Sequence, residues 1–186
     1  MQAPATSLRS LRDRPFELLL ELERRAKAAA LGAEAGSGEQ WIGVAFRIGG
    51  EIFLVARDEA REIMGVPAAV TRVPGARGWI RGLANVRGQL LPIIDLRRYL
   101  GNGETQDARN ARVIVVNHRE VPAGLVVDEV LGFRRFNEQD FHREPPPTMI
   151  RCEQYLAGSF RRGSEAWPVF SLKKLVESPV FLQGST

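Results

Sequence analysis

Apolar and polar residues alternate along much of the chain, in paired segments that predict β-hairpins. Every second residue over 42–48 is apolar, and Gly49-Gly50 separates this run from a second one over 52–56. A period of two turns one face of a strand toward a core, and two glycines between such runs are typical of a tight turn. The segment 112–127 has the same form and predicts another hairpin.

A further hairpin is predicted from Trp79 onward. Its first strand ends at the turn Arg87-Gly88, and the returning run at 90–94 is almost entirely apolar, which is typical of a strand buried on both faces. Pro92 cannot donate a ladder hydrogen bond, so it lies at a sheet edge, at a bulge or outside the paired part of the strand.

A short capped helix follows this hairpin, and the unit is repeated later in the chain. Asp95 suits the N-cap of a helix over 96–100. The segment PIIDLRR at 92–98 corresponds to PVFSLKK at 168–174. A repeated unit predicts two similar halves, so we expect a mainly β fold of two related antiparallel barrels with about five strands each.

The segments around these units have other patterns. Asp58 can cap a short helix that ends at Met64, a strand is predicted at 70–73, and the proline-rich segment 137–148 is predicted to be an exposed loop.

The chain divides into three regions by composition. Residues 1–12 are predicted to be a disordered lead, and 13–38 an amphipathic helix followed by a flexible linker. The helix has a stripe of leucine and alanine that either packs on the chain's own body or lies in a partner's groove. Residues 40–180 form the main domain, whose two halves divide near 102–111.

Composition narrows the function classes only slightly. With 186 residues, 44% of them hydrophobic, the chain can bury a core, and a net charge of +4 is a mild basic excess. A single cysteine, Cys152, excludes an internal disulfide and fits a reducing compartment. No signal-like or membrane-spanning apolar stretch is present, so we expect a cytoplasmic protein.

Candidate catalytic residues are few and scattered. His118 and His142 have no cysteine or second histidine at metal-binding spacing, and no nucleotide-binding or nucleophile motif occurs. Asp95 and Asp128 can be imagined as an acid pair, but a helix cap and a strand-end residue explain them better. The sequence therefore predicts no enzyme, no cofactor and no metal.

Arginine is concentrated around the hairpin that begins at Trp79. Five arginines lie between Arg77 and Arg98, against one carboxylate. Arg97 and Arg98 are interpreted as solvated side chains. Arg87 protrudes from a turn, where it is either solvated or a contact for a partner that carries a carboxylate.

The same hairpin resembles a family signature. The runs GLANVRG at 82–88 and LPIIDL at 91–96 resemble the G-x-x-N-L-R-G-x-x-x-P-x-x-D-L signature of CheW-like chemotaxis coupling domains, with Val86 in place of the usual leucine. Further similarity lies at 62–64 (EIM) and 124–130 (GLVVDEV).

The resemblance implies a fold, a function and partners. The fold is two interlocked five-stranded antiparallel β-barrels with short helices and no enzymatic activity. The function is that of an adaptor between the cytoplasmic tip of a methyl-accepting chemoreceptor and the regulatory domain of a CheA-type histidine kinase. The helix PFELL at 15–19 is similar to that of CheW-type adaptors in type IV pilus (twitching) systems. Such a protein is cytoplasmic and reaches receptor arrays through its partners, with no direct membrane insertion.

The resemblance also implies a partner-binding surface. Residues of the signature turn and of the EIM stretch carry it: Asn85, Arg87, Gly88, Glu62 and Ile63. One of three apolar residues at a barrel end, Val66, Leu83 or Leu90, is expected to bind the kinase.

Three alternatives remain at the level of sequence, one of which is a hydrolase that uses Cys152 or His118. The chain could be a general flagellar chemotaxis coupling protein. In a different class, it could be a basic small-barrel protein that binds nucleic acid, although its aromatic residues fall mostly on core-facing positions.

Overall fold

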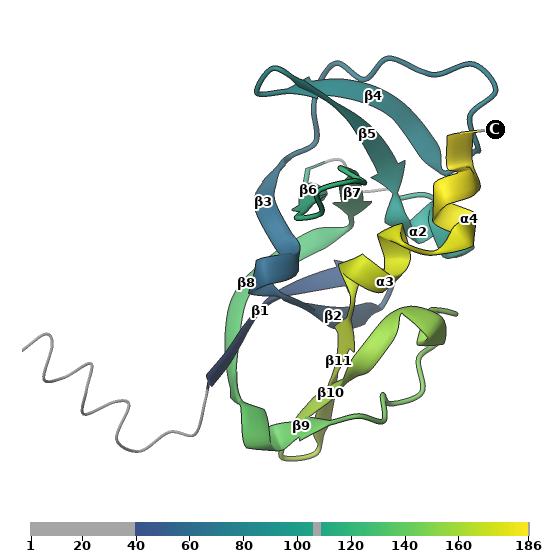
Figure 1. Ribbon diagram of the computed structural model, residues 1–186. Coiled ribbons are helices and arrows are strands. Elements are labelled where there is room, and N and C mark those ends of the chain that lie inside the picture. Colours follow the sequence, from purple (N-terminus) through teal and green to yellow (C-terminus); the bar gives the residue numbers. More distant parts are fainter. Residues whose placement is uncertain (1–39, 106–108, 186) are drawn as a thin grey trace, which may run out of the picture. The chain divides into compact units, whose positions relative to one another are not determined.

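The computed structural model describes residues 40–105 and 109–185 (Figure 1). The disordered lead, helix and linker predicted over 1–38 lie outside these residues.

The described chain folds into two β-sheets. The first has the order β8-β1-β2-β11-β10-β9, and its strands are β1 (Gln40–Ile48), β2 (Glu51–Ala56), β8 (Glu129–Asn137), β9 (Phe141–His142), β10 (Leu156–Arg162) and β11 (Glu165–Phe170). The second has the order β3-β6-β7-β5-β4, and its strands are β3 (Ala60–Gly65), β4 (Ile80–Val86), β5 (Gln89–Asp95), β6 (Arg112–Val116) and β7 (Gly124–Val127). The mainly β prediction is confirmed, and the two-residue β9 is the sixth strand of the first sheet.

Short helices follow the strands. They are α2 (Leu96–Tyr99), α3 (Leu172–Val176) and α4 (Pro179–Leu182). Within the described ranges, none of the helices combines the length and the apolar character needed to cross a bilayer.

Each sheet takes strands from both halves of the sequence. β2 pairs in parallel with β11, at Leu54 and Val169, and β5 pairs in parallel with β7 over Ile93–Asp95. The β1–β2 hairpin therefore shares a sheet with β10 and β11, which belong to the second copy of the repeated unit. The β6–β7 hairpin shares a sheet with β4 and β5, which belong to the first copy. This exchange interlocks the two sheets.

Each sheet buries residues on both of its faces. The main hydrophobic cluster takes residues from both sheets, including Phe46 and Ile114. Each sheet buries a smaller cluster of its own, which includes Ile93 and Val113 in one sheet and Phe160 in the other. Burial on both faces explains why several strands are continuous apolar runs.

The helices are held against the core by aromatic residues. Trp79 stacks on Phe181 of α4 at 5.7 Å between ring centroids, and Tyr99 of α2 meets the same ring at 5.7 Å. The hydroxyl of Tyr99 also shares a hydrogen bond with that of Tyr155, at 2.7 Å. Figure 1 shows α2, α3 and α4 beside one another at this place.

The repeated unit places a glycine at the same strained position in each copy. Gly82 has φ +143° and Gly158 has φ +151°, and the strand pairing shifts register beside each of them. A Cβ at Gly82 would lie 2.2 Å from the carbonyl oxygen of Thr71, and one at Gly158 would lie 2.3 Å from that of His142. In both copies, glycine lets a crossing segment approach the strand.

The predicted turn and proline positions are confirmed. Arg87 and Gly88 have φ values of +51° and +83°, which suits a two-residue hairpin turn. Pro92 faces Leu83 of β4, whereas the pairing of β5 with β7 begins at Ile93. Pro92 therefore lies outside that paired part, where no ladder hydrogen bond is lost.

The helix predicted from Asp58 to Met64 is wrong. Only a 3-10 turn forms at Arg57–Glu59, and the following residues are strand β3, which pairs with β6 through Ile63 and Ile114. A helix of two turns has little stability of its own, so pairing with the β-branched strand β6 prevails. The strand predicted at 70–73 reduces to one bridge, between Thr71 and Leu83.

Candidate partner-binding surface

The residues considered for catalysis lie apart from one another. His118 contacts Glu177 at 3.2 Å, and His142 is exposed on β9. Cys152 is fully buried. Across the two described ranges, no group of three His, Cys, Asp or Glu side chains could hold a metal ion.

The buried thiol of Cys152 is expected to make the protein less stable at alkaline pH. Burial raises the pKa of Cys152 from 9.0 to about 11, so the folded state disfavours the thiolate. The neutral thiol therefore contributes roughly 1–3 kcal/mol to the free energy of unfolding below pH 9. This contribution is lost as the pH rises toward 11.

We expect urea unfolding of Cys152→Ala to depend less on pH than unfolding of the wild type between pH 9 and 11. Burial also raises the pKa of Tyr99, but that contribution is common to both proteins and cancels in the difference. Parallel profiles for the two proteins would contradict the assignment to the thiol.

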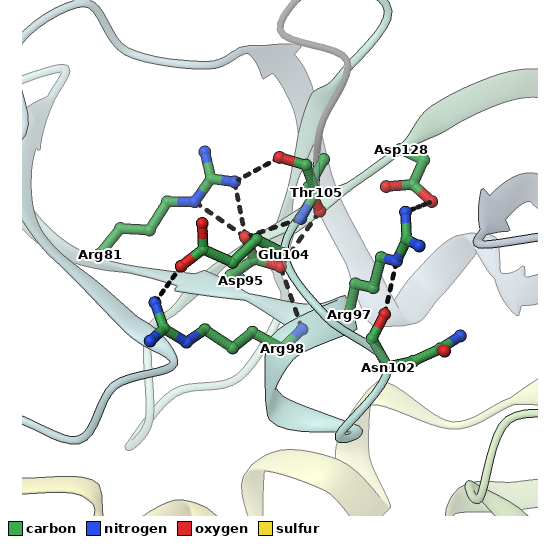
Figure 2. Close-up of polar contacts among 8 residues, drawn as sticks. All are labelled: Arg81, Asp95, Arg97, Arg98, Asn102, Glu104, Thr105 and Asp128. Atoms are coloured by element: carbon green, nitrogen blue, oxygen red, sulfur yellow. Dashed lines mark hydrogen bonds and ion pairs between the residues drawn. The ribbon is translucent and has the colours of Figure 1, made fainter.

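Asp95 is a structural residue, as predicted. It is almost fully buried, and one carboxylate oxygen accepts hydrogen bonds from Arg81 at 3.1 Å (Nε) and 2.6 Å (Nη2) (Figure 2). The Thr105 N–H donates to the same oxygen at 3.2 Å. The other carboxylate oxygen accepts from the Thr105 hydroxyl and from the Arg98 N–H, both at 3.1 Å, and the latter bond caps α2. The carboxylate thus holds β4, α2 and the following loop together.

Asp128 joins the two sheets at the passage from β7 to β8. One carboxylate oxygen accepts from the Gly49 N–H at 2.5 Å and lies 3.6 Å from Nη1 of Arg97. Arg97 also donates to the carbonyl oxygen of Asn102 at 2.7 Å, as Figure 2 shows. The interpretation of Arg97 as a solvated side chain is therefore wrong, because two acceptors fix it. Arg98 is half-exposed and pairs with Glu104.

Arg87 and Glu62 form an ion pair on the surface of the five-stranded sheet. Nη2 of Arg87 donates to Oε1 of Glu62 at 2.7 Å, and the Arg87 side chain is 80% exposed against 22% for Glu62. Glu62 lies on β3 and Arg87 at the end of β4, which are the two edge strands of the sheet. The ion pair therefore joins the two edges and leaves most of the guanidinium in solvent.

Asn85 shapes the turn that presents Arg87. Its side-chain oxygen accepts from the Gly88 N–H at 2.9 Å, which closes the turn around Arg87. The local hydrogen bond of an asparagine stabilises such turns and fixes their direction. Asn85 and Gly88 thus hold the turn in shape, and Arg87 is its exposed tip.

Ile63 differs from the other four site residues. Its side chain is partly buried and packs against the main hydrophobic cluster. Together with Glu62, it lines a groove of about 1030 Å³ between β1 and β3 that also includes the exposed Phe133. The structure therefore brings Glu62, Arg87 and the turn together, with Ile63 behind them.

One of the three apolar candidates is distinguished by exposure. The side chain of Leu90, two residues after the turn, is 70% exposed. Val66 packs on the smaller cluster of the five-stranded sheet, and the backbone of Leu83 bonds Thr71 in both directions at 2.8 Å. Leu90 lies opposite Asn85 on the hairpin whose turn presents Arg87. The hairpin end thus exposes an apolar and a charged side chain, a combination that is typical of protein interfaces.

Comparison with known proteins places these features in a family. Residues 43–180 match the CheW-like domain. Protein PilI of Pseudomonas aeruginosa is 38% identical over 170 residues, which cover 90% of this chain and 94% of PilI. The chemotaxis protein CheW of Bacillus subtilis is 30% identical over 113 residues, 61% of this chain and 70% of that protein. The crystal structure of the scaffolding protein TtCheW from Thermoanaerobacter tengcongensis superposes with a TM-score of 0.65 at 25% identity, over 76% of this chain and 96% of that chain.

Proposed function

Because the chain belongs to the CheW-like domain family, a family of coupling adaptors and not of enzymes, we propose that it couples a methyl-accepting chemoreceptor to a CheA-type histidine kinase. The observation that supports this function most directly is the surface formed by Asn85, Arg87, Gly88 and Glu62 beside the exposed Leu90. The resemblance in the signature turn is confirmed by the match over the whole domain.

The system proposed for this adaptor is twitching motility driven by type IV pili. The similarity to PilI spans 90% of the chain and includes residues ahead of the matched domain, whereas the similarity to the Bacillus CheW spans 61%. Extended similarity favours the pilus system over a general flagellar one. In this role the protein is cytoplasmic and reaches the receptor array by binding the receptor tip.

The proposed adaptor transmits its signal through partner binding and catalyses no reaction. An adaptor transmits a signal only if its contacts with the two partners differ between signalling states, since equal affinity for both states shifts no equilibrium. The interlocked sheets suit this task, because the parallel pairs β2–β11 and β5–β7 tie each half of the sequence into both sheets.

Arg87→Glu is expected to weaken association with the receptor tip or the kinase regulatory domain by about tenfold, because it reverses an exposed charge at the proposed interface. An exposed ion pair adds at most about 1 kcal/mol to stability, so the fold is retained. Affinities for purified partner fragments, measured by titration calorimetry, test this. Arg151→Glu reverses an exposed charge elsewhere and is the matched control.

A charge exchange separates partner binding from internal support. The double variant Arg87→Glu, Glu62→Arg can restore the ion pair while the exposed charge stays reversed. We expect it to bind as weakly as the single variant. Recovery of binding in the double variant would show that Arg87 acts only by holding β3, and unchanged affinity in both variants would remove Arg87 from the interface.

A further inference from the structure

A second site lies in a cavity of about 520 Å³ that contains none of the proposed partner-binding residues. It is lined by the segment between β3 and β4 and by residues of β4, β5, α2 and the loop that follows. Its charged lining consists of four arginines and two carboxylates, Arg72, Arg77, Arg81, Arg98, Asp95 and Glu104.

The carboxylates of the cavity are already engaged. Asp95 is bound by Arg81 through two hydrogen bonds, and Glu104 pairs with Arg98. Figure 2 shows Arg81 and Arg98 on either side of these two carboxylates. The internal pairs therefore leave the cavity with an excess of positive charge.

That excess comes from Arg72 and Arg77. Both are exposed, and neither guanidinium group has a hydrogen bond or ion pair with any part of the chain that the structure describes. Two guanidinium groups without acceptors at one cavity are well suited to an oxyanion, because each presents a planar fork of N–H donors.

The remaining lining is compact and apolar. Val70, Val73, Ala76 and Ile80 contribute to the wall, so the cavity can accommodate an organic group as well as a charge. Gly78 leaves room for Arg98, since a Cβ there would lie 3.3 Å from Nη2 of that residue. A cavity of this size, lined by charged side chains together with apolar ones, has the chemistry to hold a small organic anion.

We propose that this cavity binds a small molecule that carries a phosphate group. The phosphate oxygens accept hydrogen bonds from Arg72 and Arg77, and the organic part lies on the wall formed by Val73 and Ile80. The paired Arg81 and Arg98 keep Asp95 and Glu104 neutralised, so that neither carboxylate repels the ligand. The site shares no residue with the partner-binding surface proposed above.

Titration calorimetry of the full-length protein with inorganic phosphate and with phenyl phosphate tests the proposal. We expect both to bind, and phenyl phosphate to bind more tightly because its ring contacts the apolar wall. The variant with both Arg72→Ala and Arg77→Ala is expected to lose at least about tenfold in affinity for each probe.

Two further variants make the result specific. The pair Arg72→Lys and Arg77→Lys keeps the charge without the planar fork and is expected to bind with intermediate affinity. The pair Arg143→Ala and Arg151→Ala removes two exposed arginines outside the cavity and is expected to bind as the wild type does. Equal affinity of the Arg72, Arg77 alanine variant and the wild type would overturn the site, and equal affinity for the two probes would overturn the assigned class of ligand.

Discussion

Replacing Gly82 with alanine is expected to destabilise the protein by about 3 kcal/mol or more, a large fraction of the roughly 5–15 kcal/mol that stabilises an ordinary domain. The new Cβ would lie 2.2 Å from the carbonyl oxygen and 2.7 Å from the carbonyl carbon of Thr71, and both are backbone atoms that no rotamer change can move. Relief requires breaking the two 2.8 Å hydrogen bonds between Thr71 and Leu83. The φ of +143° adds strain for any residue with a side chain.

Gly88→Ala is the matched control for this prediction. Gly88 also has a positive φ, of +83°, but a Cβ there would meet no atom within 4 Å. Its replacement should therefore cost only the backbone strain, about 1 kcal/mol. Urea unfolding followed by circular dichroism gives both values, and similar losses for Gly82→Ala and Gly88→Ala would contradict the role of the close approach of Thr71.

Removing the carboxylate of Asp95 is expected to have an effect of similar size, a loss of about 3–5 kcal/mol for Asp95→Ala. The substitution leaves the partly buried guanidinium of Arg81 without its ion pair at 2.6 Å. It also removes the cap of α2 and both hydrogen bonds to Thr105. Removing one member of a buried pair costs much more than an exposed pair contributes, because the remaining charge is left desolvated.

The repeat supplies the control for Asp95. Ser171 caps α3 at the corresponding position, where its hydroxyl accepts from the Lys174 N–H at 3.3 Å and bonds Glu59 at 2.9 Å. Ser171→Ala should cost about 1–2 kcal/mol, because it removes a neutral cap and one hydrogen bond to Glu59 but no charge. If chemical unfolding gave equal losses for Asp95→Ala and Ser171→Ala, the ion pair with Arg81 would contribute nothing beyond capping.

The predictable parts of the fold are those fixed by neighbouring residues. The turn at Arg87 and Gly88, the cap at Asp95 and the hairpins each depend on backbone preferences and alternation within a few residues. The repeat, read from the matching segments 92–98 and 168–174, indicated two similar units.

The rest depends on contacts between distant residues. The pattern of 58–64 fits a helix, and only pairing with β6, about fifty residues later, makes it a strand. Nothing in the sequence indicates that β2 pairs with β11, because parallel partners are chosen by packing. The ion pair of Arg87 with Glu62 was also beyond prediction. Their motifs place both residues on the partner surface, but their contact requires the two sheet edges to meet.

The exposure of Leu90 is another feature that the sequence does not predict. Alternation placed Leu90 within an apolar run, in which burial on both faces is the usual outcome. Its 70% exposure follows from its position two residues after the turn, opposite Asn85. Exposure at a strand end is set by where neighbouring strands stop, and the sequence of one strand does not contain that information.

The central claim is that one chain holds a receptor and a kinase at the same time. Sedimentation velocity of the full-length protein, mixed with a receptor-tip fragment and a kinase regulatory domain, measures this directly. The account predicts a single species that contains all three proteins and that is lost or diminished with Arg87→Glu. Two binary complexes that exclude one another, or no complex with either partner, would contradict it.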